Sequence, residues 1–197
     1  MQPIYVQALL YADDIVLITE TKEELQNSIN KWAEEITKTG MTLNIGKSKV
    51  MRVSKNEREE ELVIEYNNER LEEVNNYTYL GVEISKDGKI EEEINNRIRK
   101  ANNIYYQINN TVLGKKEMPN KTKLQVYKTT ILPTITYGAE SWVVNTKIES
   151  RITATEMKCL RKIAGRTRKD KIRNTVIREE VDIAPATEII ERKALNG

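Results

Sequence analysis

Two adjacent aspartates, Asp13 and Asp14, stand between apolar residues in the stretch LLYADDIVL at residues 9–17. Carboxylates are rarely buried in proteins unless they are paired or bind a metal ion. Their hard oxygen atoms suit Mg²⁺ or Mn²⁺. In two-metal enzymes, carboxylates of this kind hold the metal ions that stabilise the attacking and the leaving oxygen of an in-line displacement. The alternative is an ordinary turn, in which aspartate is also common. The apolar runs on both sides favour a metal-binding hairpin tip.

The composition restricts the other kinds of chemistry. The chain has no histidine, which excludes Ser-His and Cys-His catalysis and every zinc site that needs histidine. Its one cysteine, Cys159, cannot form an internal disulfide, and we expect a small packed residue rather than a nucleophile. No apolar run approaches the roughly 20 residues of a membrane helix, and the N-terminus lacks the pattern of a signal peptide. We expect an intracellular protein, nuclear or cytoplasmic, with no membrane partner.

The elements around the aspartates are predicted from apolar spacing. Residues 4–10 and 15–19 read as strands of a tight hairpin with the two aspartates at its tip. A helix is expected over about 22–39, because Thr21 and Glu24 form a capping box and apolar residues then recur at helical spacing. Gly40 can end this helix. Short strands are expected at 41–45, 49–53, 62–66 and 77–85, the last followed by a turn at Asp87 and Gly88.

The pattern changes to helices near residue 86. Apolar residues at 3.6-residue spacing predict a long helix over 90–112 that ends at Gly114. A second helix is expected from 120 to about 131, stopped by Pro133, and a third over 147–164 before Gly165. Asp170 can cap a fourth helix, and Pro185 can start a fifth. The fold class predicted is α+β, with an α+β domain at 1–85 and an all-helical domain at 86–197.

The charge is divided between the two halves of the chain. Residues 1–93 carry 11 lysines and arginines against 20 aspartates and glutamates, whereas residues 94–197 carry 21 against 10. An asymmetry of this kind favours a nucleic acid or another polyanion as partner of the basic half. The alternative is two solvated surfaces that attract each other.

The basic charge is densest in the tract KCLRKIAGRTRKDKIR at 158–173. Interspersed apolar residues would anchor the tract, so that its cations contact nucleic-acid phosphates. A solubilising helix face or a localisation signal has a similar composition. The candidate nucleic-acid-binding residues are Lys158, Arg161, Lys162, Arg166, Arg168, Lys169, Lys171 and Arg173.

YADD between two apolar strands resembles the catalytic signature of reverse transcriptases, and the surrounding order resembles the type encoded by non-LTR, LINE-like retrotransposons. YADDIVLIT at 11–19, GMTLNIGKSKVM at 40–51 and YLGVEI at 79–84 carry this resemblance. TTILPTITYGAESW and MKCLRKIAGRTRKDKIRN resemble the segment that follows the polymerase in the same elements. The resemblance implies the C-terminal part of a polymerase palm at 1–85 and a helical, thumb-like and connection region at 86–197.

Site roles follow from the same resemblance. Asp13 would be the principal metal ligand and Asp14 its supporting neighbour. Lys47 would offset charge on the leaving pyrophosphate, although a solvated turn lysine is an equal alternative. Gly81 would belong to the primer grip or simply relieve strand crowding. The residues implied near the primer or nucleotide are Tyr11, Ala12, Tyr79, Leu80 and Gly81.

The family's polymerase needs another aspartate, upstream of YADD, and a fingers region, which this sequence does not contain. We therefore expect a fragment of an RNA-directed DNA polymerase that is inactive alone. The intact enzyme would use Mg²⁺ or Mn²⁺, an RNA template, a DNA primer and deoxynucleoside triphosphates. The alternatives are a non-catalytic nucleic-acid-binding remnant of a transposable element and a product with no role.

Overall fold

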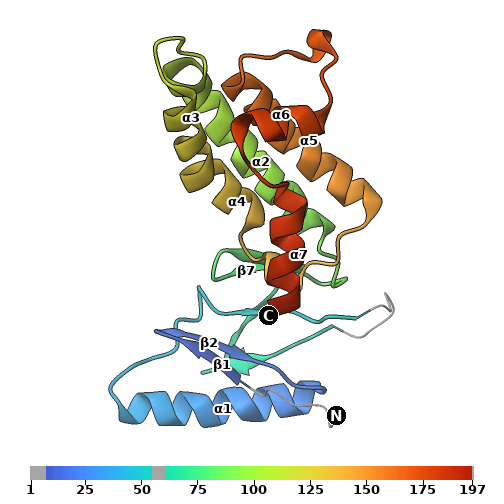
Figure 1. Ribbon diagram of the computed structural model, residues 1–197. Coiled ribbons are helices and arrows are strands. Elements are labelled where there is room, and N and C mark those ends of the chain that lie inside the picture. The colour runs from blue at the N-terminus through green and yellow to red at the C-terminus, as the bar shows by residue number, and fades with distance from the viewer. Residues whose placement is uncertain (1–7, 55–60, 197) are drawn as a thin grey trace. The chain divides into compact units, whose positions relative to one another are not determined.

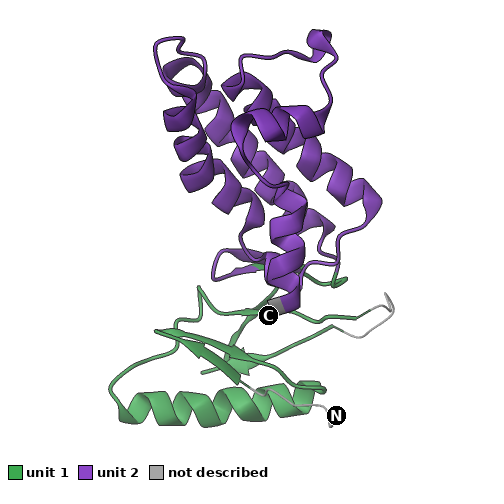
Figure 2. Ribbon diagram, in the orientation of Figure 1, with its two compact units in different colours: residues 1–77, 85–88 green, residues 78–84, 89–197 purple. Residues whose placement is uncertain are grey.

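A computed structural model describes residues 8–54 and 61–196 of the chain, which divides into two compact units. Unit 1 comprises residues 1–77 and 85–88, and unit 2 comprises residues 78–84 and 89–197 (Figure 2). The chain is a mixture of helices and small two-stranded sheets, as the predicted α+β class requires. No helix among the described residues is long and apolar enough to cross a membrane.

Unit 1 begins with the predicted hairpin. Strands β1 (Ala8–Tyr11) and β2 (Asp14–Leu17) pair antiparallel, with Ala8 opposite Leu17 and Tyr11 opposite Asp14 (Figure 1). Residues 4–7 of the predicted hairpin lie outside the described residues. Helix α1 (Lys22–Lys38) follows, and its capping box is present because Thr21 and Glu24 bond each other's backbone amides. Gly40, at φ +78°, comes two residues after the helix, so both predicted ends of α1 are confirmed.

The remaining strands of unit 1 are shorter than predicted. β3 (Lys49–Val50) pairs in parallel with β6 (Glu72–Glu73), and β4 (Glu65–Tyr66) pairs antiparallel with β5 (Glu69–Arg70). The strand predicted at 41–45 is wrong. The Asn44 carbonyl accepts hydrogen bonds from the Ser48 amide and hydroxyl, and the Asn44 side chain accepts one from the Lys47 amide. Such local bonds compete with strand pairing and close a turn instead.

A further hairpin is formed by β7 (Asn76–Tyr79) and β8 (Val82–Ser85). Its two turn residues, Leu80 and Gly81, have φ +48° and +80°. Positive φ at both central residues is the signature of the tight turns that suit twisted strands, and glycine adopts it without strain. A Cβ atom at Gly81 would lie 3.6 Å from the Tyr137 hydroxyl, an ordinary contact, so backbone conformation rather than crowding explains this glycine.

Unit 2 is helical apart from residues 78–84, which belong to this hairpin (Figure 1). Its first helix is α2 (Glu91–Ile108), which continues as a π-helical turn at Asn109–Leu113. The longest helix after α2 is α5 (Thr146–Ile163), followed by Gly165 at φ +66°. These two confirm the first and third predicted helices. The other helices are α3 (Asn120–Val126), α4 (Leu132–Thr136), α6 (Asn174–Val181) and α7 (Ala186–Asn196), with short 3₁₀ turns at Ala139–Ser141 and Arg168–Asp170.

Two predicted helix boundaries in unit 2 are wrong. The helix expected to stop at Pro133 continues from α3 through a π-helical turn at Tyr127–Ile131 into α4. Pro133 lies inside this continuous helix, just after the π-helical turn, where its missing N–H and its ring have a cost that they would not have at a helix start. Asp170 does not cap α6. It accepts hydrogen bonds from the Thr167 amide and hydroxyl and closes the 3₁₀ turn, and Arg173 holds the N-cap position of α6.

Each unit has its own hydrophobic core. The core of unit 1 consists of Ile29, Val50, Leu62, Ile64 and Leu71. The core of unit 2 is much larger and is built from buried residues of α2, α4, α5, α6 and α7 and of the short π-helical and 3₁₀ turns, with Ile131, Ile135 and Ile152 fully buried. Trp142 is buried in this second core, whereas Trp32 on α1 is only partly buried.

Candidate functional site

The two aspartates lie at the tip of the β1–β2 hairpin. Ala12 and Asp13 form the two-residue turn, and Asp14 is the first residue of β2, directly opposite Tyr11. Ala12 has φ +53°, the left-handed conformation that the first residue of such a tight turn adopts. All four residues of the YADD motif are exposed. Both carboxylates are therefore available to a ligand from outside the chain.

The strands that carry the aspartates are less buried than the apolar runs predict. Leu9, Leu10 and Tyr11 of β1 are 42%, 60% and 62% exposed, whereas Ile15, Val16 and Leu17 of β2 are partly buried. The difference arises because the sheet has only two strands and α1 packs against β2. The expectation of apolar burial on both sides of the aspartates is therefore wrong for β1.

The hairpin tip offers ligands of the type that a divalent cation prefers, but only two of them. Carboxylate oxygens are the ligands that Mg²⁺ prefers, and Asp13 and Asp14 supply them from adjacent residues. Within residues 8–54 and 61–196, no group of three or more histidine, cysteine, aspartate or glutamate side chains could hold a metal ion. Mg²⁺ bound here would need further oxygens from a nucleotide, from water or from another polypeptide segment.

Lys47 lies in the turn that follows Asn44 in unit 1. Its amide donates to the Asn44 carbonyl at 3.2 Å and to the Asn44 side chain at 3.0 Å. Its side chain is exposed, and among the described residues it forms no ion pair or hydrogen bond with Asp13 or Asp14. The turn holds the backbone of Lys47 while leaving the ammonium group available to an anion.

The β7–β8 turn contains two of the predicted primer-side residues, Leu80 and Gly81, and Tyr79 directly precedes it. The turn is held by side chains of unit 2 helices that the sequence did not reveal. The Tyr137 hydroxyl donates to the Leu80 carbonyl at 2.7 Å, and Arg97 donates to the Gly81 carbonyl. Tyr79 is partly buried, whereas Leu80 and Gly81 are exposed. Both turn carbonyls are thus fixed by one helical unit.

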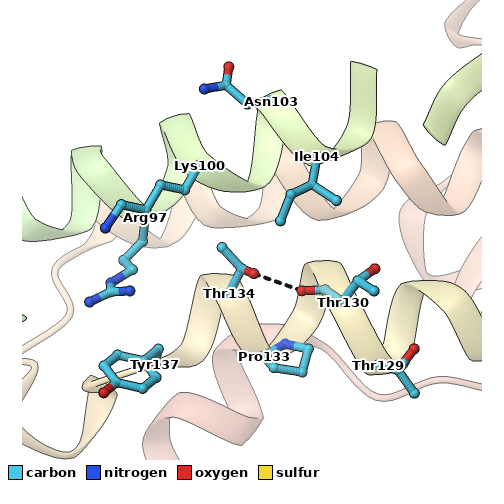
Figure 3. A pocket seen from close by; sticks show the side chains of 9 residues that line it. All are labelled: Arg97, Lys100, Asn103, Ile104, Thr129, Thr130, Pro133, Thr134 and Tyr137. Atoms are coloured by element: carbon cyan, nitrogen blue, oxygen red, sulfur yellow. Dashed lines mark hydrogen bonds between the residues drawn. The ribbon is translucent and has the colours of Figure 1, made fainter. Parts of the chain in front are cut away.

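Arg97 is itself held by a buried ion pair. It donates to Glu93 one helical turn earlier, and its guanidinium lies 4.5 Å from the centre of the Tyr137 ring (Figure 3). Glu93 also accepts from the Glu83 amide at 2.9 Å. The spacing of Glu93 and Arg97 was visible in the sequence, but their burial and their contacts with residues 81–83 depend on tertiary packing.

A groove of about 650 Å³ lies beside Arg97, between α2 and the continuous helix of α3 and α4 (Figure 3). The Thr134 hydroxyl donates a hydrogen bond to the Thr130 carbonyl of the same helix, so its proton is not available to a ligand. Arg97 and Lys100 are the cations among the lining residues, and Arg97 is already paired. The groove therefore offers Lys100 as its exposed cation. The other lining residues are Asn103, Ile104, Thr129, Pro133 and Tyr137.

Three cations of the basic tract already have hydrogen-bond or ion-pair partners inside unit 2. The Lys158 ammonium donates to Asn102 and to the Tyr106 hydroxyl, and it lies 4.5 and 3.9 Å from the ring centres of Tyr105 and Tyr106. Arg161 donates to the Ile172 carbonyl and to Asn174, and Arg166 pairs with Glu180. The remaining five are exposed and make no ion pair among the described residues: Lys162, Arg168, Lys169, Lys171 and Arg173.

Two buried groups of unit 2 have perturbed acidity. Burial raises the pKa of the Cys159 thiol to about 12, with an opposing effect of Lys158 and a further rise from Glu156. Burial also raises the pKa of the Tyr127 hydroxyl, to which the nearby Glu156 adds. Glu156 itself is buried and accepts from Arg178 and from the Ala186 amide at 2.9 Å. These contacts join α5, α6 and α7, so we interpret the cluster as structural.

Comparison with known proteins gives two matches. Residues 1–84 match the family model described as reverse transcriptase (RNA-dependent DNA polymerase). A transposon-derived protein of Caenorhabditis elegans is 26% identical over 179 residues, which cover 89% of this chain and 62% of the relative. The chain thus spans less than two thirds of the length of that relative. No solved structure matches this chain. Residues 1–84 are accordingly a reverse transcriptase-like segment, in a chain similar to a transposon-derived protein.

Proposed function

We propose that the chain is part of an RNA-directed DNA polymerase of a non-LTR retrotransposon, with its metal site at the tip of the β1–β2 hairpin. One observation carries this proposal. The YADD motif forms a two-residue turn that exposes Asp13 and Asp14 together, within the 84 residues that match the reverse transcriptase family. An isolated tetrapeptide could occur by chance, whereas this placement is what a metal-binding hairpin tip requires.

Each residue of the site has a role in this proposal. Mg²⁺ or Mn²⁺, when bound, supplies charge stabilisation at the attacking and leaving oxygens. Asp13 is the principal ligand and Asp14 the supporting one, while the triphosphate and a further carboxylate of the whole polymerase supply other oxygens. Lys47 offers an exposed cation to the leaving pyrophosphate. The Leu80–Gly81 turn contacts the primer strand, and its two carbonyls are already occupied by Tyr137 and Arg97.

Titration of the chain with Mn²⁺ tests the metal site. Because Mn²⁺ is paramagnetic, its binding should broaden the amide NMR signals of residues 11–15 before those of other segments. Asp13→Asn should abolish the selective broadening. Glu34→Gln is the matched control, because Glu34 and Glu35 are also adjacent, exposed carboxylates in unit 1. Broadening that survives Asp13→Asn, or that is equally strong around Glu34, would remove the metal site from the proposal.

A second candidate function is nucleic-acid binding by unit 2 without catalysis. It is favoured by the five exposed cations of the tract and by the excess of basic residues in 94–197. Such binding is dominated by phosphate contacts and therefore weakens with salt. Five contacts would give a log–log slope of roughly −3.5 to −4.5, at about 0.7 to 0.9 per contact. A salt titration of RNA binding, followed by fluorescence anisotropy, measures this slope.

A further inference from the structure

A second groove of unit 2 lies along α5 and has a cationic end. Its volume is about 580 Å³, in the range of cavities that hold small ligands. One wall is a face of α5 on which lining residues recur at helical spacing, and the other is the segment at 168–174. The α5 residues that matter for its chemistry are Ser150, Thr153, Ala154, Met157 and Arg161.

The cationic end is built by contacts already present in the chain. Arg161 donates to the Ile172 carbonyl at 3.1 Å and to Asn174 at 2.7 Å, so it fixes the 168–174 segment against α5. Arg168 and Lys171 line the same end, and both are exposed without an ion pair among the described residues. The capping box of Thr167 and Asp170 closes the 3₁₀ turn that carries Arg168. Three cations therefore meet in one preformed place.

The rest of the groove is suited to a flat, partly apolar group. Ala154, Met157 and Ile172 give it an apolar lining next to the cations. Ser150 and Thr153 add hydroxyls that can donate or accept hydrogen bonds. Glu149 is the one carboxylate among the lining residues, and it lies three helical turns from Arg161 on α5. A ligand with an anionic group and an uncharged ring would contact both the cations and the apolar lining, whereas a simple anion would contact the cations alone.

We propose that this α5 groove binds one nucleotide of a single-stranded nucleic acid, its phosphate at Arg161, Arg168 and Lys171 and its base over Ala154, Met157 and Ile172. A single strand is required because the bases of a duplex are stacked and paired, so a base and its phosphate cannot enter a groove together. The lining has no aromatic side chain among the described residues, so the base face packs against aliphatic groups, a contact that any base can make. The inference rests on the proposed nucleic-acid-binding function of unit 2 and assigns it a specific site.

The experiment compares serine variants of neighbouring cations in the full chain. Arg168→Ser and Lys171→Ser each remove a positive charge that lines the groove, and Arg151→Ser removes an exposed charge of α5 that lies outside both the lining and the basic tract. With a fluorescent ten-nucleotide oligouridylate, the two groove variants should each weaken binding about 10-fold, the usual effect of losing a hydrogen bond to a charged group. Arg151→Ser should weaken binding less than 2-fold. Inorganic phosphate should compete only weakly.

A charge-neutral variant tests the base-binding part separately. Ala154 is exposed, so Ala154→Tyr can fill the groove without disturbing the core. It should weaken oligouridylate binding and leave binding of a duplex of equal length unchanged. If all three serine variants weaken binding equally, or if Ala154→Tyr has no effect, the groove is not the site and only diffuse electrostatic binding remains. If the unchanged chain binds no RNA at about 50 mM salt, the nucleic-acid-binding function fails as well.

Discussion

Arg97 shows how much one buried side chain can hold together. It pairs with Glu93, donates to the Gly81 carbonyl and stacks on Tyr137. Arg97→Met removes the charge partner while keeping much of the volume, so Glu93 stays buried without its cation. Breaking a buried pair from one side costs about 3–5 kcal/mol. We expect a loss of that size in the free energy of unfolding of unit 2, measured by urea denaturation with Trp142 fluorescence in chains that also carry Trp32→Phe.

The matched control for this prediction is Arg99→Met. Arg99 lies on the same helix but is exposed, and surface substitutions of this kind usually change stability by less than about 0.5 kcal/mol. Equal losses for the two variants would show that the ion pair contributes nothing beyond a general effect of removing a charge from α2.

Cys159 gives a prediction about pH. Its thiol is buried and donates to the Thr155 carbonyl, and its pKa is raised to about 12. Because the thiolate is the reactive form, modification by iodoacetamide should stay slow between pH 7 and 10 in the folded chain. The unfolded thiol ionises at lower pH, so this group favours folding below its unfolded pKa, and that contribution declines as pH rises towards 12. Mass spectrometry of the alkylated protein measures the rate.

The comparison for Cys159 is the same reaction in 6 M urea, where the rate should rise steeply through pH 8 to 9 as in a free thiol. A folded-state rate that follows the same rise would show that the thiol is accessible. It would also contradict the interpretation of Cys159 as a packed residue of the unit 2 core.

For helices and strands, local sequence signals were sufficient to predict an element whose interacting residues are close in sequence. The Thr21–Glu24 capping box and the apolar runs on both sides of YADD lie within a few residues, and the structure has α1 and the β1–β2 hairpin there. The strand predicted at 41–45 failed because Asn44 satisfies nearby amides itself. Pro133 failed as a stop signal because the core around Ile131 and Ile135 favours a continuous helix over the local cost of proline.

Elements that meet across long sequence distances could not be predicted. The contacts of Arg97 with Gly81, and of Tyr137 with Leu80, join residues 16 and 57 positions apart. Nothing in residues 79–81 indicates which helix will fix them. The basic tract shows the same limit. Its charges were evident in the sequence, but the cation–π contacts of Lys158 with Tyr105 and Tyr106 were not. Composition indicates that cations are present, and packing decides which of them a ligand can reach.

The two separate cores predict two unfolding transitions. In the described residues, five buried apolar residues form the core of unit 1 and nineteen form that of unit 2. Because buried apolar area is the main source of stability, unit 1 should unfold at the lower urea concentration. Trp32 belongs to unit 1 and Trp142 to unit 2, and the chain has no other tryptophan. The variants Trp32→Phe and Trp142→Phe therefore report each unit alone.

Coincident midpoints in these two variants would show that the units unfold as one cooperative body. Hydrogen exchange provides the control, because it reads both units in the unchanged chain. Amides of α1 should then exchange at lower urea than those of α2 and α5.

The left-handed backbone at Ala12 has a consequence for how the gene can drift. At φ +53° glycine is favoured over alanine by about 1 kcal/mol, and the exposed methyl group of Ala12 finds no buried packing in the described part of the chain. A single base change converts an alanine codon into a glycine codon. Selection for stability alone would therefore favour glycine here, and alanine retained in diverged copies would record selection for a role of the hairpin tip other than stability.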